Sequence, residues 1–276
     1  MCAETSADRS DKAPSGAAIG SAPPAAAARR QDGFAAGPLA WLLVALAAGA
    51  VAWVLLETFD PVFAVPEHLA NLPTPAPVED LIALEMASRK AETRNAILFV
   101  GILGAAVGGS LAVGEGVARR SGRAVLTAAL AATAVAAAFG CLAALAGHAV
   151  FDYHRPLQDL SPLAKTIRTQ GAMLATLGAG IGLAVGLFSG SWRTGLTCLA
   201  GGLLAGVLAG MVYPMLAAVF LPGVATELVV PLGAVDRLLW IAVIAGLAAA
   251  IISSVARRRP PRESRPATEQ PPPPSA

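Results

Sequence analysis

Charged residues are scarce in this sequence. They make up 14% of its 276 residues, while 55% are hydrophobic, and ordinary soluble domains carry roughly 25% charged residues. This shortage argues against a typical soluble protein. Six apolar stretches approach or exceed the roughly 20 residues that a helix needs to cross a bilayer. The predicted spans are residues 38–56, 95–113, 124–147, 171–190, 195–221 and 238–256.

Ionisable residues are missing from the interior of these predicted spans. Such residues mark ion paths and proton relays, so the sequence gives no sign of either. It also lacks a serine and a histidine placed together within spans, a phosphate-cradling loop, and paired aspartates in the membrane. We therefore predict that the protein is not an enzyme and needs no cofactor.

Cysteine is scarce as well. Cys2 lies in a polar segment, whereas Cys141 and Cys198 lie in apolar stretches, where a free cysteine usually acts as a small buried hydrophobe. The densest reactive cluster is a predicted outer loop at residues 148–155, and a metal could be held there by His148, Asp152 and His154, with help from His68. No two histidines stand four apart, so we predict no metal site.

The two ends of the chain differ from the part between them. Residues 1–37 are rich in Ala, Ser, Pro and Gly, and residues 257–276 are basic and then proline-rich. We expect disordered tails flanking a transmembrane domain of residues 38–256. The first span follows an Arg-Arg pair and is too long for a typical signal-peptide core, which predicts an uncleaved anchor.

One loop, residues 57–94, is much longer than the others. Its second half carries apolar residues at helical spacing, and it begins with two acidic residues. This pattern predicts an amphipathic helix over residues 79–92, lying at the outer face of the membrane.

Arginines collect on the side of the membrane that holds both ends of the chain. Arg123 and Arg193 occupy equivalent turns on that side, and we expect them to anchor the topology. Because cytoplasmic flanks carry an excess of Lys and Arg, both termini are predicted to be cytoplasmic. The predicted location is the cell inner membrane, with several spans.

Several segments resemble one another along the chain. Residues 121–127 match residues 191–197, and Pro162 and Arg168 match Pro231 and Arg237. Weaker matches extend the pattern to the first two spans. We therefore predict an all-α bundle built from three tandem helical hairpins, related by rotation about the membrane normal.

Small residues recur at every fourth position in most of the spans. Each such step turns about 400° around a helix, so the small residues form a groove, and close backbone approach drives helix association in lipid. We expect these positions to pack helices together. The glycines concerned are Gly104, Gly108, Gly178, Gly182, Gly186, Gly190, Gly202, Gly206 and Gly210.

Residues 95–98, 121–127 and 178–197 carry a resemblance to known proteins. Over about residues 38–256 the chain resembles polytopic bacterial membrane proteins with glycine-zipper helical hairpins. The resemblance implies a membrane bundle and no particular activity.

Two functions remain open at this point. The first is a non-catalytic scaffold or self-assembling bundle, whose partners are the lipid bilayer and copies of itself, with no nucleic acid. The alternative is a small-solute transporter or channel with a path between the three hairpins. Tyr213 and Pro214 would then form a kinked gate, and Ser110, Thr133 and Thr176 a polar lining.

Overall fold

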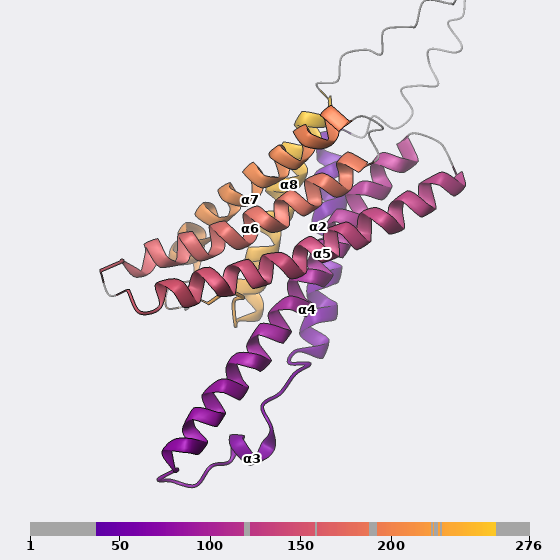
Figure 1. Ribbon diagram of the computed structural model, residues 1–276. Helices are drawn as coiled ribbons and strands as arrows, with labels where there is room; N and C mark the ends of the chain where they lie inside the picture. Colours follow the sequence, from indigo (N-terminus) through magenta and orange to yellow (C-terminus); the bar gives the residue numbers. More distant parts are fainter. Residues whose placement is uncertain are drawn as a thin grey trace, which may run out of the picture. The chain divides into compact units, whose positions relative to one another are not determined.

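The protein is all-helical wherever the structure, a computed structural model, describes it (Figure 1). The described residues are 37–118, 122–157, 159–187, 192–221, 223, 226 and 228–257. The predicted tails apart from residues 37 and 257, together with Gly190 and the side chain of Arg123, lie outside this description. The helices are α2 (Pro38–Phe59), α3 (Glu67–Ala70), α4 (Val78–Ala118), α5 (Gly122–His154), α6 (Pro162–Leu187), α7 (Trp192–Phe220) and α8 (Ala234–Arg257).

Within the described chain, six of these helices, all but the single-turn α3, are long and apolar enough to cross a membrane. The prediction of a six-span integral membrane protein is thus confirmed at the level of helix number, length and composition. Helix α2 begins, and helix α8 ends, at the same end of the bundle (Figure 1). We call this the tail end, and the opposite end, which carries α3, the α3 end.

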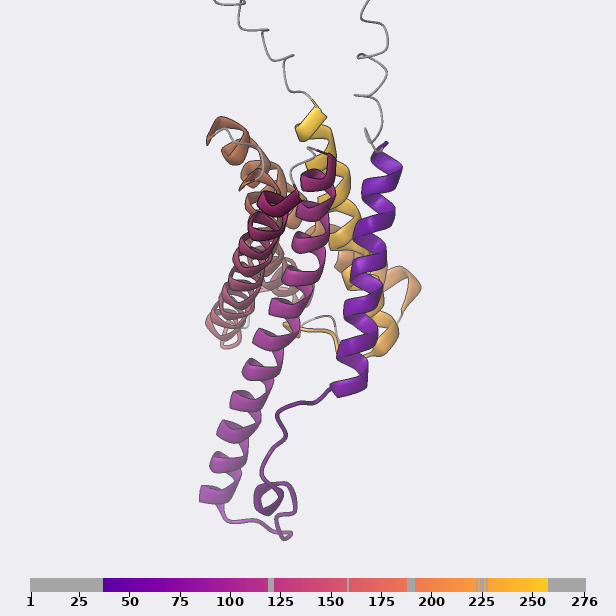
Figure 2. The same ribbon diagram turned by 90° about the vertical axis from the view of Figure 1, so that its right-hand side faces the viewer.

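Three helices lie inside the bundle and three lie outside. Helices α4, α6 and α8 contact one another, whereas α2 lies against α8 and α4, α5 against α4 and α6, and α7 against α6 and α8 (Figure 2). Burial follows this division. In the 18-residue apolar stretch of each helix, 67% is buried in α6, whereas 22% is buried in α2. The exposed sides of the outer helices are the surfaces that would face lipid.

Large apolar side chains fill the space between the three inner helices. Leu103 of α4, Leu177 and Ile181 of α6, and Trp240 and Ile244 of α8 belong to one buried cluster, each with at most 1% of its surface exposed. Close packing of this kind leaves few voids larger than a water molecule. The centre of the bundle is therefore an apolar core.

The closest helix pairs are α4 with α5 and α6 with α7. A Cβ added at Gly104 would meet the backbone oxygen of Ala136, and one added at Gly140 would meet that of Val100. Both pairs are joined at the tail end. The predicted hairpins, by contrast, were α2 with α4, α5 with α6 and α7 with α8, and this arrangement is not confirmed.

Glycine faces glycine along the contact between α6 and α7. A Cβ added at Gly178 would meet the backbone oxygen of Gly202, and the reverse also holds. A Cβ added at Gly206 would meet the backbone oxygen of Leu174. The other glycines named above lie at similar contacts: Gly108 faces Ala136, Gly182 faces Cys198, Gly186 faces Gly195, and Gly210 faces Gly171.

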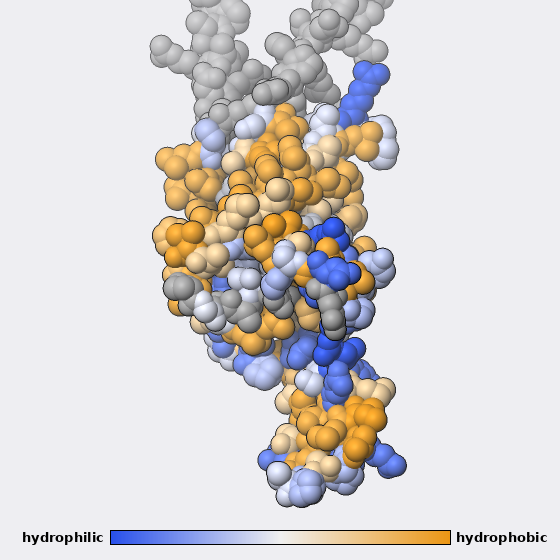
Figure 3. Space-filling model, turned by 90° about the vertical axis from the view of Figure 1, so that its left-hand side faces the viewer, coloured by the Kyte–Doolittle hydropathy of each residue, from blue (hydrophilic) through white to orange (hydrophobic). Residues whose placement is uncertain are grey.

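Helix α4 is longer than the sequence pattern suggested. Its 41 residues span about 60 Å at 1.5 Å per residue, about twice the roughly 30 Å of hydrocarbon. Residues 79–92 are helical as predicted, but they form the first turns of α4 and not a separate helix. This part of α4 projects at the α3 end, and its residues Val78, Ile82 and Met86 are exposed. In Figure 3, an apolar surface lies at this end of the molecule, beyond a belt of hydrophilic side chains.

The predicted outer loop at residues 148–155 is also mostly helical. Helix α5 continues to His154, and only the turn at Arg155 follows it. No glycine or proline interrupts residues 148–155, so the helix persists after its apolar residues end. His148 and Asp152, four residues apart, consequently lie on one face of α5.

Candidate functional site

The α3 end of the bundle holds a layer of buried polar side chains. At its centre Arg237, near the start of α8, is only 8% exposed. Its Nη1 lies 3.1 Å from Oε1 of Glu57 and its Nη2 lies 2.6 Å from Oδ2 of Asp60. Its Nε donates to the carbonyl oxygen of Pro231 at 2.7 Å. We call these four residues the Arg237 clasp.

The clasp joins the end of α2 to the beginning of α8. A second bond reinforces this contact, because Nε1 of Trp53 on α2 donates to the carbonyl oxygen of Ala234 at 2.9 Å. The guanidinium also lies over the ring of Phe99 on α4, 5.7 Å from its centroid, close enough for a cation–π interaction. Three helices therefore meet at one cation.

Two more polar pairs lie beside the clasp. The hydroxyl of Tyr213 on α7 donates to Oδ1 of Asp236 on α8 at 2.8 Å. On α6, Gln170 is fully buried, accepts from Nε1 of Trp240 at 2.9 Å and donates to the carbonyl oxygen of Leu228 at 2.8 Å. The first pair joins α7 to α8, and the bond to Leu228 fixes the segment between α7 and α8 to α6.

Two neighbouring cavities open at this level. The first, of about 480 Å³, lies between α4, α5 and residues 228–229. The second, of about 340 Å³, lies between α4, the Arg237 clasp and residues 228–232. Both are lined by Glu92, His148, Leu228 and Val229, so the two cavities adjoin. Volumes of roughly 300–1,000 Å³ are typical of sites for small ligands.

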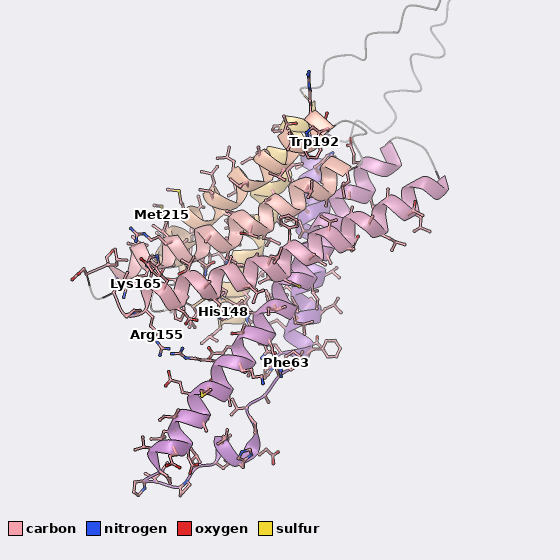
Figure 4. The ribbon with its side chains drawn as sticks, in the orientation of Figure 1. Phe63, His148, Arg155, Lys165, Trp192 and Met215 are labelled. Atoms are coloured by element: carbon pink, nitrogen blue, oxygen red, sulfur yellow. The ribbon has the colours of Figure 1, made fainter. Side chains whose placement is uncertain are left out.

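His148 lies between the two cavities on α5. Its Nε2 is buried and has no hydrogen-bond partner among the described residues. The carboxylates of Asp152 and Glu92 lie near enough to interact with it electrostatically. In Figure 4, His148 on α5 and Arg155, just after the end of α5, both lie on the side of α5 that is turned toward α4.

The structure separates the three candidate metal ligands. His148 and Asp152 line the first cavity, whereas His154 does not; it is 8% exposed and contacts Tyr153 edge to face. In the part of the chain that the structure describes, no group of three His, Cys, Asp or Glu side chains is arranged to hold a metal ion. His68, on α3, lines neither cavity.

The residues proposed to line a transport path form hydrogen bonds within their own helices. Ser110 donates to the carbonyl oxygen of Val107, Thr133 to that of Ala129, and Thr176 to that of Ala172. Tyr213, proposed as part of a gate, bonds to Asp236, and α7 continues through Pro214. None of these hydroxyls needs a water-filled path to satisfy its hydrogen bond.

Sequence reasoning missed the most buried charges of this layer, Asp236 and Arg237. Both precede the apolar stretch of the last span, where charges usually mark a solvated flank. Arg237 matched Arg168 in the repeat, yet Arg168 is exposed. Glu57 and Asp60 follow the first predicted span in the same way, so nothing in the local sequence around any of these residues indicated that they pair.

The chain matches no known family model, no curated protein and no solved structure.

Proposed function

We propose that the protein is a non-catalytic membrane scaffold: a packed helical bundle that holds the projecting part of α4 and the polar layer at the α3 end in fixed positions. The apolar core between α4, α6 and α8 carries this proposal, because Leu103, Leu177, Ile181 and Trp240 occupy the place where a central path would run. A conduit needs polar groups or water along its length.

The scaffold belongs in the cell inner membrane, with both termini in the cytoplasm and the α3 end outside. Its partners are the lipid bilayer and further copies of the chain, and nucleic acid is not among them. Arg193 supports this orientation, since it is exposed at the first turn of α7 at the tail end, where cytoplasmic arginines are enriched.

A flux assay distinguishes the scaffold from the transporter. The purified full-length protein is reconstituted into liposomes at a measured orientation, and leakage of protons, K⁺ and small neutral solutes is compared with protein-free liposomes. We expect equal leakage. Protein-dependent flux of any of these solutes would contradict the scaffold and favour the alternative function.

Native mass spectrometry of the same preparation tests self-assembly. A defined oligomer is the expected result, and a monomer at every protein concentration would remove copies of the chain from the list of partners.

Cysteine labelling tests the orientation. Single cysteines are introduced by Gly122→Cys at the tail end and Ser161→Cys at the α3 end, in a background without the native cysteines. We expect an impermeant reagent to label only the second variant in intact cells. Labelling of the first variant from outside would reverse the proposed topology.

A further inference from the structure

One side of α4 carries an apolar stripe that faces the bundle core and then resumes beyond it. Inside the bundle the stripe consists of residues spaced alternately four and three apart, each at most 5% exposed: Ala96, Val100, Leu103 and Val107. The same spacing, continued toward the start of α4, passes through the polar Thr93 and Arg89 and then reaches Met86 and Ile82. Because seven residues turn a straight helix only about 20° away from a whole number of turns, these positions share one side of α4.

The resumed part of the stripe is uncovered. Ile82 is 55% exposed and Met86 is 68% exposed, while the adjacent Val78 and Leu81 are 71% and 48% exposed. We call these four residues the open stripe. Figure 3 looks at the molecule from the side where α5 and α6 are joined at the α3 end, and it shows an apolar surface on the projecting part. Large apolar side chains gathered outside a bilayer mark an interaction surface.

The first cavity lies at the base of the open stripe and carries more negative than positive charge. Arg89 and Arg155 both pair with Glu85, at 3.0 and 3.5 Å. Glu92 and Asp152 also line the cavity, and neither has a cation within ion-pair distance in the described chain. An occupant that brings a cation to this end of the open stripe would therefore be favoured.

We propose that the open stripe and the first cavity together bind an amphipathic helix of a partner protein on the outer side of the membrane. Its apolar residues pack against Ile82 and Met86, as helices do in apolar grooves, and a lysine or arginine lies between Glu92 and Asp152. The six residues from Met86 to Glu92 span about 9 Å, so the basic residue follows the apolar contacts by about two turns. The partner helix continues, outside the bundle, the packing that the core provides to the same side of α4.

A second copy of the chain in the same membrane does not fit this surface. The open stripe and the bundle lie on the same side of α4, so two open stripes facing each other would bring two bundles into the same space. Lipid does not fit either, because a belt of hydrophilic side chains separates the apolar surface from the spanning part in Figure 3. Met86 precedes Asn95, the start of the predicted span, by nine residues, or about 14 Å of helix.

Photo-crosslinking in the native membrane identifies the occupant. The full-length protein carries p-benzoylphenylalanine in place of Ile82 or Met86 or, as a control, in place of Glu67, which is exposed on α3. We expect a discrete protein adduct from the first two positions and none from the third. The cross-linked segment of the partner should have apolar residues three and four apart, with a lysine or arginine about two turns beyond them.

Every other outcome overturns the proposal. An adduct between two copies of the chain would assign the surface to self-assembly, and an adduct with lipid would assign it to the bilayer. No adduct, or equal adducts from all three positions, would mean that the open stripe has no specific occupant. A partner segment without the apolar spacing or without the basic residue would contradict the proposed helix.

A synthetic peptide of the cross-linked segment assigns the contacts. Its dissociation constant for the full-length protein in nanodiscs is measured by fluorescence anisotropy. Ile82→Ser with Met86→Ser should weaken binding at least about tenfold, because two apolar side chains lose their burial. Glu92→Gln with Asp152→Asn should weaken it about threefold, as expected for an ion pair that water can reach, and replacing the basic residue of the peptide by glutamine should then cause no further loss.

The matched control is Val62→Ser with Glu67→Gln, which removes an exposed apolar side chain and an exposed carboxylate away from the open stripe and the first cavity. It should leave the affinity unchanged. Native affinity in the Ile82 and Met86 double variant, or an equal loss in the control, would overturn the assignment. The inference rests on the scaffold function, yet the two fail separately: a missing adduct removes the partner helix, whereas solute flux in liposomes contradicts the scaffold whether or not an adduct forms.

Discussion

Helices α6 and α7 are held together in a different way from helices α2 and α8. Along α6 and α7, Gly178 lies against Gly202, and Gly206 lies against the backbone of Leu174. Helix α2 has one comparably tight small-residue position, where a Cβ added at Gly49 would lie 2.7 Å from Cγ2 of Ile241. At its α3 end, α2 relies on the Arg237 clasp.

This difference shows two ways of associating helices where burial against lipid gains little. The contact between α6 and α7 depends on glycines, whose lack of a side chain lets the two backbones approach closely. The contact between α2 and α8 depends at one end on three charged side chains that neutralise one another. Adding an atom at one of these glycines should weaken the contact between α6 and α7, and removing a charge should weaken the contact between α2 and α8.

The largest effect should follow from Gly206→Ala. The new Cβ would meet the backbone oxygen of Leu174, and backbone atoms cannot swing aside as a side chain can. We expect a loss of about 3 kcal/mol in the free energy of unfolding, at the upper end of overpacking costs. Unfolding in detergent, followed by circular dichroism as denaturant is added, measures it.

Gly171→Ala is the matched control on α6. A Cβ at Gly171 would have no atom within 4 Å. The free energy of unfolding of this variant should therefore differ by at most about 0.5 kcal/mol from that of the native protein. Equal losses in the two variants would mean that the approach of the Leu174 backbone to Gly206 does not explain the effect.

A smaller effect should follow from Arg237→Met, which leaves Glu57 and Asp60 without their cation. Breaking a fully buried pair costs about 3–5 kcal/mol. Here each carboxylate side chain is 28% exposed, so water can solvate it, and we expect a loss of about 2 kcal/mol. The free energy of unfolding in detergent again reports the change.

Arg168→Met tests whether this cost belongs to the clasp. Arg168 matches Arg237 in the sequence repeat, but it is exposed. Arg168→Met should therefore leave the free energy of unfolding almost unchanged. The triple variant Arg237→Met, Glu57→Gln, Asp60→Asn should recover part of the lost stability, because no uncompensated carboxylate remains. A triple variant no more stable than Arg237→Met would indicate that packing of the arginine stem dominates.

Gln170→Leu should cost less again. It would leave the indole N–H of Trp240 and the carbonyl oxygen of Leu228 without their partner, and each unmet buried group costs about 1–3 kcal/mol. Because residues 228–229 border the cavities and can admit water, we expect about 1.5 kcal/mol in total. In the comparison variant Thr176→Val, the lost hydroxyl bonded only to its own helix, and the change should stay within about 0.5 kcal/mol.

The six spans could be predicted from the sequence because their signal is local. Apolar length alone specifies a spanning helix, and every predicted stretch lies in one of the observed helices or, at its margins, just beyond their ends. The helix ends could not be read from hydropathy in the same way. Helix α4 starts at Val78 and α5 ends at His154, because polar residues without glycine or proline continue a helix once it has begun.

The polar layer was less predictable because its partners are distant in the chain. Glu57 and Arg237 are separated by 180 residues, and Gln170 and Trp240 by 70. The His148 cluster was noticed from local density, but its helical conformation, which puts His148 and Asp152 on one face, was not. Gln170 gave no signal of its own, since one glutamine beside a span is ordinary at a membrane boundary.

The smallest predicted change, Gly246→Ala, asks whether α8 shares the tight packing of α6. A Cβ at this position would lie 3.7 Å from Cδ1 of Leu42 on α2, which is an ordinary van der Waals contact with a flexible side chain. Replacing glycine by alanine in a helix that accepts it restricts the unfolded chain and stabilises the protein by about 0.5 kcal/mol. A measured gain of that size would show that α2 and α8 leave room between their backbones. A loss approaching that of Gly206→Ala would instead mean that both contacts rest on the same close approach, and that the clasp only adds to it.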